Sequence, residues 1–137
     1  MRIIIDCNIW ISWLIGHQTQ LVRQILLNPR FDVYVCDALL DEIRDVVNRS
    51  KIRKYVSEAE CTDLFRIIQS FCIFAEIESN ACAKVRDPKD LYLLSFAESI
   101  NADYIISGDN DLVTLEQHKN TKILKLAEFK ENFKIPC

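Results

Sequence analysis

The stretch MRIIIDCN, residues 1–8, decides the fold that we expect for this chain. Its three consecutive isoleucines predict a short strand that is buried on both faces, as strands are in a parallel sheet covered by helices. The strand delivers the carboxylate of Asp6 at its carboxyl end. Ligands of open α/β sheets bind at the carboxyl ends of the strands, so Asp6 is the first candidate site residue.

Length and composition limit the possible answers. The chain has 137 residues, of which 50% are hydrophobic and 27% are charged, enough for one ordinary domain with its own core. We therefore expect a single domain over residues 1–137. The formal net charge of −3 argues against wholesale electrostatic binding of nucleic acid but leaves room for a local basic patch.

The six cysteines predict neither a zinc site nor disulfides. No two of them form a CxxC pair, and the apolar run at the N-terminus stops after three isoleucines, which is too short for a secretory signal. We expect reduced thiols in a cytoplasmic protein. No apolar stretch approaches the roughly 18 residues of a membrane span, so no membrane association is expected.

Strands and helices are expected to alternate along the chain. After the first strand, helices are predicted over 8–15 and 18–28, a strand over 31–36, a helix over 37–47 capped by Asp37, and a longer helix from Ser57. Residues 71–77 fit a third strand, although helix and strand are hard to separate there. A helix over 87–101 with Asp87 at its N-cap, a strand over 102–106, a strand over 122–126 and a terminal helix follow. This order predicts a parallel sheet covered on both faces.

Acidic residues recur at the edge where the strands end. Asp109 follows the fourth strand as Asp6 follows the first, and Asp90 has Leu94 and Ala97 on its own helical face, which points it inward. On the helix over 37–47, spacing does not select Glu42 over its acidic neighbours Asp41 and Asp45.

Each acid also has a purely structural explanation. Asp6 and Asp109 are suited to cap the helices that follow them, and Asp90 to be the N3 residue of a capping box. Three or four converging carboxylates would nevertheless repel one another, and a bound divalent cation is the usual physical solution. Oxygen ligands suit the hard ions Mg²⁺ and Mn²⁺.

Four motifs together resemble the PIN domain. They are Ile-Asp-Cys-Asn at 5–8, Leu-Leu-Asp-Glu-Ile at 39–43, Asp-Pro-Lys-Asp at 87–90 with Ala97 downstream, and Ala-Asp-Tyr-Ile-Ile-Ser-Gly-Asp-Asn-Asp-Leu at 102–112. Within that superfamily, the chain looks most like the VapC-type toxins of prokaryotic toxin-antitoxin pairs. The resemblance extends from Arg2 to about Phe133. Any one motif is weak, whereas their order and spacing together are specific.

The resemblance implies a three-layer α/β/α sandwich with a five-stranded parallel sheet and a Mg²⁺- or Mn²⁺-dependent ribonuclease. The four acids of the family fall on Asp6, Glu42, Asp90 and Asp109, with Asp111 as an additional metal ligand beside Asp6, Asp90 and Asp109. The resemblance thus selects Glu42, which spacing did not.

The chain departs from the family at two positions. Cys7 stands where a threonine or serine is usual, and Leu91 stands where a second acid often follows Asp90. Cys7 removes a hydroxyl near the metal, and Leu91 removes a negative charge near it. A catalytically weak or inactive PIN-like domain that binds RNA or protein is therefore the alternative. A receiver-like domain fits less well, because Asp6 has no acidic neighbour.

Other polar residues are candidates for substrate contact. Asn8 and Ser107 are expected to orient a phosphate oxygen or a ligand water. A basic run that follows the helix of Glu42 is a candidate RNA-binding patch, as are Lys119, Lys122 and Lys125 near the other rim. For either patch, a solvated surface is an equally good interpretation. The basic run comprises Arg49, Lys51, Arg53 and Lys54.

The expected partners are an RNA substrate, a cognate antitoxin protein and a second copy of the chain. The homodimer is expected to form through the apolar N-terminal helices, where Trp10 and Trp13 share one helical face. We interpret these tryptophans as core or dimer-face residues rather than as a stacking platform for bases. His17 and His118 lie in polar connections, so a histidine-based ribonuclease mechanism is not expected.

Overall fold

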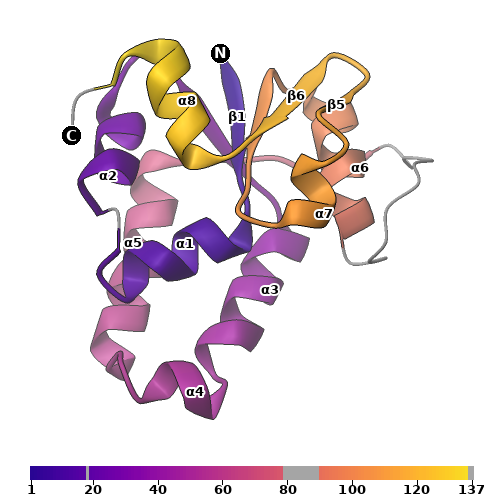
Figure 1. Cartoon of the computed structure of the whole chain (residues 1–137). Coiled ribbons are helices and arrows are strands. Elements are labelled where there is room, and N and C mark those ends of the chain that lie inside the picture. Colours follow the sequence, from indigo (N-terminus) through magenta and orange to yellow (C-terminus); the bar gives the residue numbers. More distant parts are fainter. Residues whose placement is uncertain (18, 79–89, 136–137) are drawn as a thin grey trace.

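The computed structural model of the chain describes residues 1–17, 19–78 and 90–135 (Figure 1). Strands and helices alternate through most of it, as expected for an α/β protein. In chain order the elements are β1 (Arg2–Ile5), α1 (Cys7–Leu14), α2 (Thr19–Leu27), β2 (Asp32–Val35), α3 (Asp37–Val47), α4 (Ser50–Arg53), α5 (Glu58–Phe71), β3 (Ile73–Phe74), α6 (Leu91–Ile100), β4 (Tyr104–Ile106), α7 (Asn110–Val113), β5 (Gln117–His118), β6 (Thr121–Leu124) and α8 (Leu126–Phe133).

One sheet contains all the described strands, in the order β3-β2-β1-β4-β6-β5. The five strands β3, β2, β1, β4 and β6 pair in parallel, which confirms the predicted parallel sheet. A sixth strand was not predicted: β5 pairs with β6 in the antiparallel sense. β5 is only two residues long, and a tight turn in which Lys119 has a left-handed backbone (φ 52°) joins it to β6. A strand of two residues shows no hydrophobic alternation, so the sequence pattern could not identify it.

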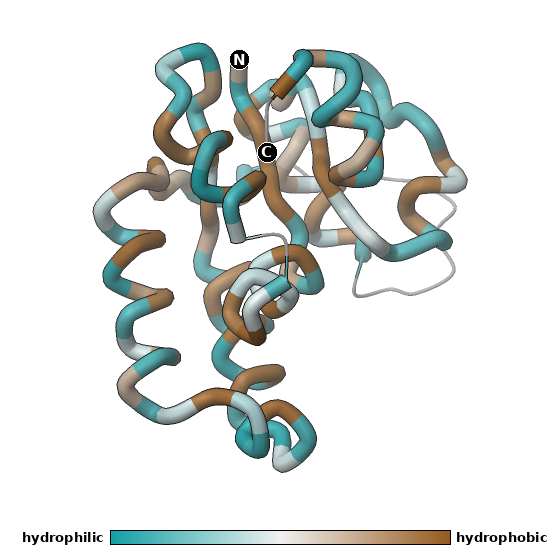
Figure 2. The backbone as a smooth tube through the Cα atoms, turned by 60° about the vertical axis from the view of Figure 1, so that its left-hand side comes forward, coloured by the Kyte–Doolittle hydropathy of each residue, from teal (hydrophilic) through white to brown (hydrophobic). Residues whose placement is uncertain are grey.

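The core lies between the sheet and helices on both of its faces. Figure 1 shows α1, α2, α5 and α8 on one side of the sheet and α6 on the other. Ile3, Ile4 and Ile5 of the central strand β1 are at most 1% exposed, in line with the triple-isoleucine pattern. The hydropathy colouring of Figure 2 shows the same hydrophobic central strand, with hydrophilic residues on the outer parts of the helices.

Several boundaries differ from the predicted ones. Cys36, and not Asp37, is the N-cap of α3, and its side chain makes no capping hydrogen bond. Of the predicted helix start at 87–90, residues 87–89 lie outside the described residues. The described helix α6 begins at Leu91, with Asp90 as its N-cap. The predicted capping box also needs Asp87, which lies outside the described residues. Ser57 does form a capping box, with Glu60, at the start of α5.

The directions of the strands show where the carboxyl edge of the sheet lies. β1 runs from the N-terminus downward to α1 in Figure 1, so the carboxyl ends of the parallel strands face the lower side of that view. Asp6 directly follows β1, and Asp109 follows β4, which is the neighbour of β1 in the sheet. In the described residues, no helix is long and apolar enough to cross a membrane.

Candidate functional site

The four predicted acids lie together at the carboxyl edge of the sheet. They line one cavity of about 310 Å³, although they come from four separate segments of the chain. Asp6 follows β1, Glu42 lies on α3, Asp90 precedes α6 and Asp109 precedes α7. Among the described residues, the lining comprises Asp6, Cys7, Asn8, Ile11, Glu42, Val46, Arg49, Asp90 and Asp109.

Asp6 is the most buried of these acids. Its Oδ1 accepts a hydrogen bond of 2.7 Å from the backbone N–H of Cys7, so it also caps α1, as its structural explanation predicted. The pKa of Asp6 is raised from 3.8 to about 6, and burial is the largest cause. The hydrogen bonds from Ser107 and Cys7 lower this pKa, and the negative charges of Glu42 and Asp109 add to the rise. The site therefore disfavours the ionised form of Asp6, and a cation beside the carboxylate would stabilise that form.

Ser107 and Asn8 tie Asp6 to the loop that carries Asp109. The hydroxyl of Ser107 donates to Oδ2 of Asp6 at 2.6 Å, while its oxygen accepts from the backbone N–H of Asp109 at 3.0 Å. Asn8 accepts from the backbone N–H of Gly108 at 3.1 Å, and its Nδ2 lies 3.5 Å from Oδ2 of Asp6. Both side chains thus tie the carboxylate of Asp6 to the backbone of the loop that follows the neighbouring strand β4.

The acids near α7 and α6 differ in their local roles. Asp109 is the N-cap of α7 and accepts from the backbone N–H of Asp111 at 2.9 Å, while Asp111 is not among the residues that line the cavity. Asp90 is only 8% exposed, and its side chain makes no capping hydrogen bond to α6. The cap therefore explains the position of Asp109 but not that of Asp90.

The structure separates Glu42 from its acidic neighbours on α3. Asp41 and Asp45 are exposed and form ion pairs of 3.1 Å and 3.4 Å with Arg44 and Arg49. Glu42 is half-buried, lines the cavity and accepts a hydrogen bond of 2.5 Å from the hydroxyl of Tyr92 on α6.

Sequence reasoning missed Tyr92. The available signal was its position two residues after Asp90, but that position is equally typical of a core aromatic residue. The contact itself joins residues 50 positions apart in the sequence.

Cys7 lies within the cavity as a buried thiol. Burial raises the pKa of Cys7 far above its usual range, and the negative charges of Glu42 and Asp6 add to this effect. The thiol consequently keeps its proton at neutral pH, and a protonated thiol is neither a nucleophile nor a metal ligand. Cys7, Cys36, Cys61 and Cys72 are free thiols in the structure.

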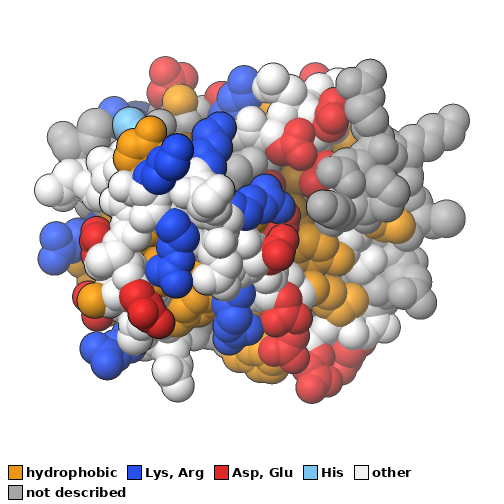
Figure 3. Space-filling model, turned by 90° about the horizontal axis from the view of Figure 1, so that it is seen from below, with side chains coloured by type: hydrophobic (Ala, Val, Ile, Leu, Met, Phe, Trp, Pro, Cys, Tyr) orange, Lys and Arg blue, Asp and Glu red, His pale blue; other side chains and the backbone are white. Residues whose placement is uncertain are grey.

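Basic side chains adjoin the acidic cavity. Arg49 is the one cationic residue that lines it within the described part of the chain. Lys51, Arg53 and Lys54 follow on α4 and its C-cap, and all of them are exposed. Figure 3, which looks onto this face from below, shows Lys and Arg side chains gathered near its middle with acidic side chains beside them.

The three lysines of the second predicted basic patch, Lys119, Lys122 and Lys125, have separate surroundings in the structure. Lys119 is paired with Glu98, whereas Lys125 follows β6 and lines a separate small cavity with Ser107 and Gly108. Lys122 lies on β6 itself, at the opposite end of the strand from Lys125.

The donor chemistry of the cavity fits a hard divalent cation. Counted over the residues that the structure describes, four carboxylates line the cavity together with one guanidinium, which itself pairs with Asp45. This part of the lining therefore carries excess negative charge, and that charge is on oxygen ligands only. Within the described residues, however, no three acidic, histidine or cysteine side chains are arranged so that they could hold a metal ion as they stand. The fit is therefore one of charge and ligand type, and binding would draw the carboxylates closer together.

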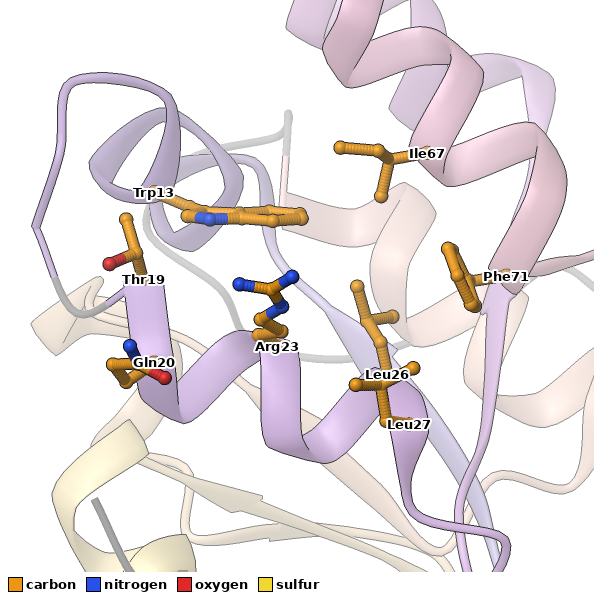
Figure 4. Close-up of a pocket in the computed structure, with 8 residues that line it drawn as sticks. All are labelled: Trp13, Thr19, Gln20, Arg23, Leu26, Leu27, Ile67 and Phe71. Atoms are coloured by element: carbon orange, nitrogen blue, oxygen red, sulfur yellow. The ribbon is translucent and has the colours of Figure 1, made fainter.

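A second, apolar pocket of about 400 Å³ lies away from the acids, between α1, α2 and α5 (Figure 4). Trp13 and Phe71 lie on opposite sides of it, with Arg23 as the charged residue in its lining. Trp10 is fully buried and donates its ring N–H to the carbonyl of Ile5 at 3.0 Å. Trp10 is therefore a core residue, as predicted, whereas Trp13 reaches the surface pocket.

Comparisons with known proteins agree with the resemblance that the motifs predict. A family model described as the PIN domain matches residues 2–111. A solved structure, "Crystal structure of VapBC2 from Rickettsia felis bound to a DNA fragment from their promoter", is similar with a TM-score of 0.64 and 15% sequence identity, over 90% of this chain and 97% of that chain. At that identity the likeness shows the fold. A comparison with curated protein sequences finds no match.

Proposed function

Because the chain belongs to the PIN domain family, we propose that it is a metal-dependent nuclease that hydrolyses RNA phosphodiester bonds. The observation that carries this proposal is the convergence of Asp6, Glu42, Asp90 and Asp109 on one cavity. Carboxylates from four distant segments repel one another unless something compensates their charge. Mg²⁺ or Mn²⁺ would provide that compensation.

In this proposal the acids have distinct roles. Asp6, Asp90 and Asp109 would hold the ion, with Glu42 bound directly or through a water and Asp111 as a further ligand beside Asp109. When bound, the ion would lower the pKa of a ligand water and neutralise charge on the scissile phosphate.

The other residues of the site would position the acids or bind the RNA. Ser107 and Asn8 keep Asp6 in place through the hydrogen bonds described above. Asn8 is also suited to orient a phosphate oxygen, since it lines the cavity and its amide carries hydrogen-bond donors. Ser107 is fully buried and its hydroxyl already donates to Asp6, so its contribution is to position that carboxylate. Arg49 is placed to attract the phosphate backbone because its side chain is a cation in the described lining.

Cleavage of a mixed RNA tests the proposal. We expect the wild-type chain to cut RNA with Mg²⁺ or Mn²⁺ and to lose this activity in EDTA, with recovery when the ion is restored in excess. Cleavage that persists in EDTA would contradict metal dependence. RNA binding without cleavage would favour the alternative of a non-catalytic PIN-like binding domain, which the buried, protonated Cys7 in the cavity keeps open.

We expect the basic run beside the cavity to hold the RNA backbone. Exchange of Arg49, Lys51, Arg53 and Lys54 for alanine should weaken RNA binding and flatten its salt dependence. The slope of log K against log salt should fall by about 0.7 for each lost phosphate contact on single-stranded RNA. Binding measured at several salt concentrations checks this, with Arg66→Ala as the control, because Arg66 is exposed on α5 and paired with Asp63. An unchanged slope in the fourfold variant would remove this patch from the RNA site.

We further propose that the chain is the toxin of a toxin-antitoxin pair and acts in the cytoplasm. The support is the similarity to VapBC2 of Rickettsia felis together with the VapC-like order of the motifs. An antitoxin protein would then be its partner, and a homodimer through α1 and α2 remains our expectation. Unimpaired growth of cells that express the chain alone would contradict the toxin assignment, and light scattering of the purified chain would give its oligomeric state.

A further inference from the structure

Glu42 has a neutral side-chain partner on a different helix. Tyr92 lies on α6, only two residues after Asp90, and its hydroxyl donates to Oε1 of Glu42 on α3 at 2.5 Å. Tyr92 itself is not among the cavity-lining residues, whereas Glu42 is. The tyrosine therefore reaches the carboxylate from the side of α6 and not from the cavity.

We infer that Tyr92 is a positioning residue that holds the Glu42 carboxylate in the cavity and ties it to the start of the helix that carries Asp90. The inference rests on the proposed metal-dependent function and adds to it a residue that motif and spacing do not mark. Because Tyr92 does not line the cavity, its effect on a bound ion or on substrate passes through Glu42.

A hydroxyl has an advantage over a basic side chain at this position. Arg44 and Arg49 neutralise Asp41 and Asp45 on the exposed side of the same helix. A lysine or arginine at position 92 would neutralise Glu42 in the same way and compete with a cation. The tyrosine hydroxyl orients one oxygen of Glu42 and leaves the negative charge available.

The phenol of Tyr92 is also a neutral donor. Burial raises the pKa of Tyr92 above its usual range, and the hydrogen bond to Glu42 and the negative charges of Glu42 and Asp6 raise it further. A protonated phenol adds no negative charge beside the carboxylates.

The test is a double-mutant cycle read out as Mn²⁺ affinity of the full chain, measured by titration calorimetry with Mn²⁺ alone. Tyr92→Phe removes only the hydroxyl, and we expect the affinity to fall by about 10-fold, as is typical when a partner of a metal ligand is removed. In a Glu42→Gln background the same change should have no further effect. Tyr104→Phe is the matched control, because Tyr104 is half-buried in an aromatic cluster with Phe129 and Phe133 on β4 and α8.

Each outcome is decisive. An equal loss of affinity in both backgrounds, wild-type affinity in Tyr92→Phe, or a Tyr92→Phe chain that no longer folds would each overturn the positioning role. Failure of the proposed function looks different: in that case the wild-type chain itself neither binds Mn²⁺ nor cleaves RNA. If wild type binds and cleaves while Tyr92→Phe equals it, the nuclease proposal stands and only the role of Tyr92 is lost.

Discussion

Cleavage of RNA by the Asp6→Asn variant is expected to fall at least about 100-fold below that of the wild type at saturating Mg²⁺ or Mn²⁺, because removal of a mere partner of a metal ligand already costs about 10- to 100-fold. Asparagine keeps the shape of the side chain and an oxygen for the N–H of Cys7, but it removes the negative charge. In our proposal the ion binds to the negative charge at the end of β1. Removal of this charge should therefore lower both kcat and the affinity for Mn²⁺. Single-turnover cleavage and calorimetry measure the two effects.

The matched control is Asp63→Asn, an equal loss of charge on the exposed surface of α5, where Asp63 pairs with Arg66 at 3.4 Å. It should cleave like the wild type. If Asp6→Asn and the wild type cut RNA equally, Asp6 is no more than a helix cap and the nuclease activity does not use this cavity. If both variants lose activity equally, general electrostatics and not the cavity controls cleavage.

The fold follows from local patterns wherever an element is long or buried enough to show one. Three consecutive isoleucines identify β1, and the strand–helix alternation identifies the parallel sheet. The short elements α4 and β5, at four and two residues, carry no complete hydrophobic period and were not predicted. The equally short α7 was expected only as the helix that Asp109 would cap. The predicted start of α6 at Asp87 falls on residues that the structure does not describe, so only its continuation from Leu91 to Ile100 can be compared.

The candidate site was predictable where strand ends and motif order determine it. Asp6 and Asp109 follow from the rule that ligands bind at the carboxyl ends of parallel strands. Glu42 needed the family resemblance, since the feature that distinguishes it from Asp41 and Asp45 is a contact across helices with Tyr92. Such a contact depends on how α3 and α6 pack, which a one-dimensional pattern does not contain. The structure does not include Asp111 in the cavity lining, so its role remains a prediction.

Asp6, the carboxylate that we propose as a metal ligand, should also lower the free energy of unfolding at neutral pH. Asp6 ionises at 3.8 in a solvated chain but at about 6 in the folded chain, so the folded chain holds a proton there after the unfolded chain has released it. For a carboxyl with a raised pKa, the penalty is absent below pH 3.8, grows as the pH rises to about 6 and is complete above it. Without a cation, the ionised Asp6 thus destabilises the fold at neutral pH.

Asp6→Asn should therefore unfold at a higher denaturant concentration than the wild type when both are free of metal at pH 7, with a gain of about 2 kcal/mol. The gain should shrink toward zero as the pH is lowered from 6 to below 4, because the wild-type carboxyl then becomes neutral as well. Urea unfolding at several pH values in EDTA checks this, with Asp63→Asn as the variant expected to follow the wild type.

Mn²⁺ should reverse the ranking, since a ligand that binds only the folded state stabilises it by about 2.7 kcal/mol at 100 times its Kd. The ion would stabilise the wild type and leave Asp6→Asn almost unchanged. An Asp6→Asn chain that is less stable than the wild type in EDTA would show that the hydrogen bonds from Ser107 and Cys7 outweigh the burial of the charge. The opposite result, a more stable chain that no longer cleaves, would mean that the carboxylate at the end of β1 is retained for its chemistry at the expense of the fold.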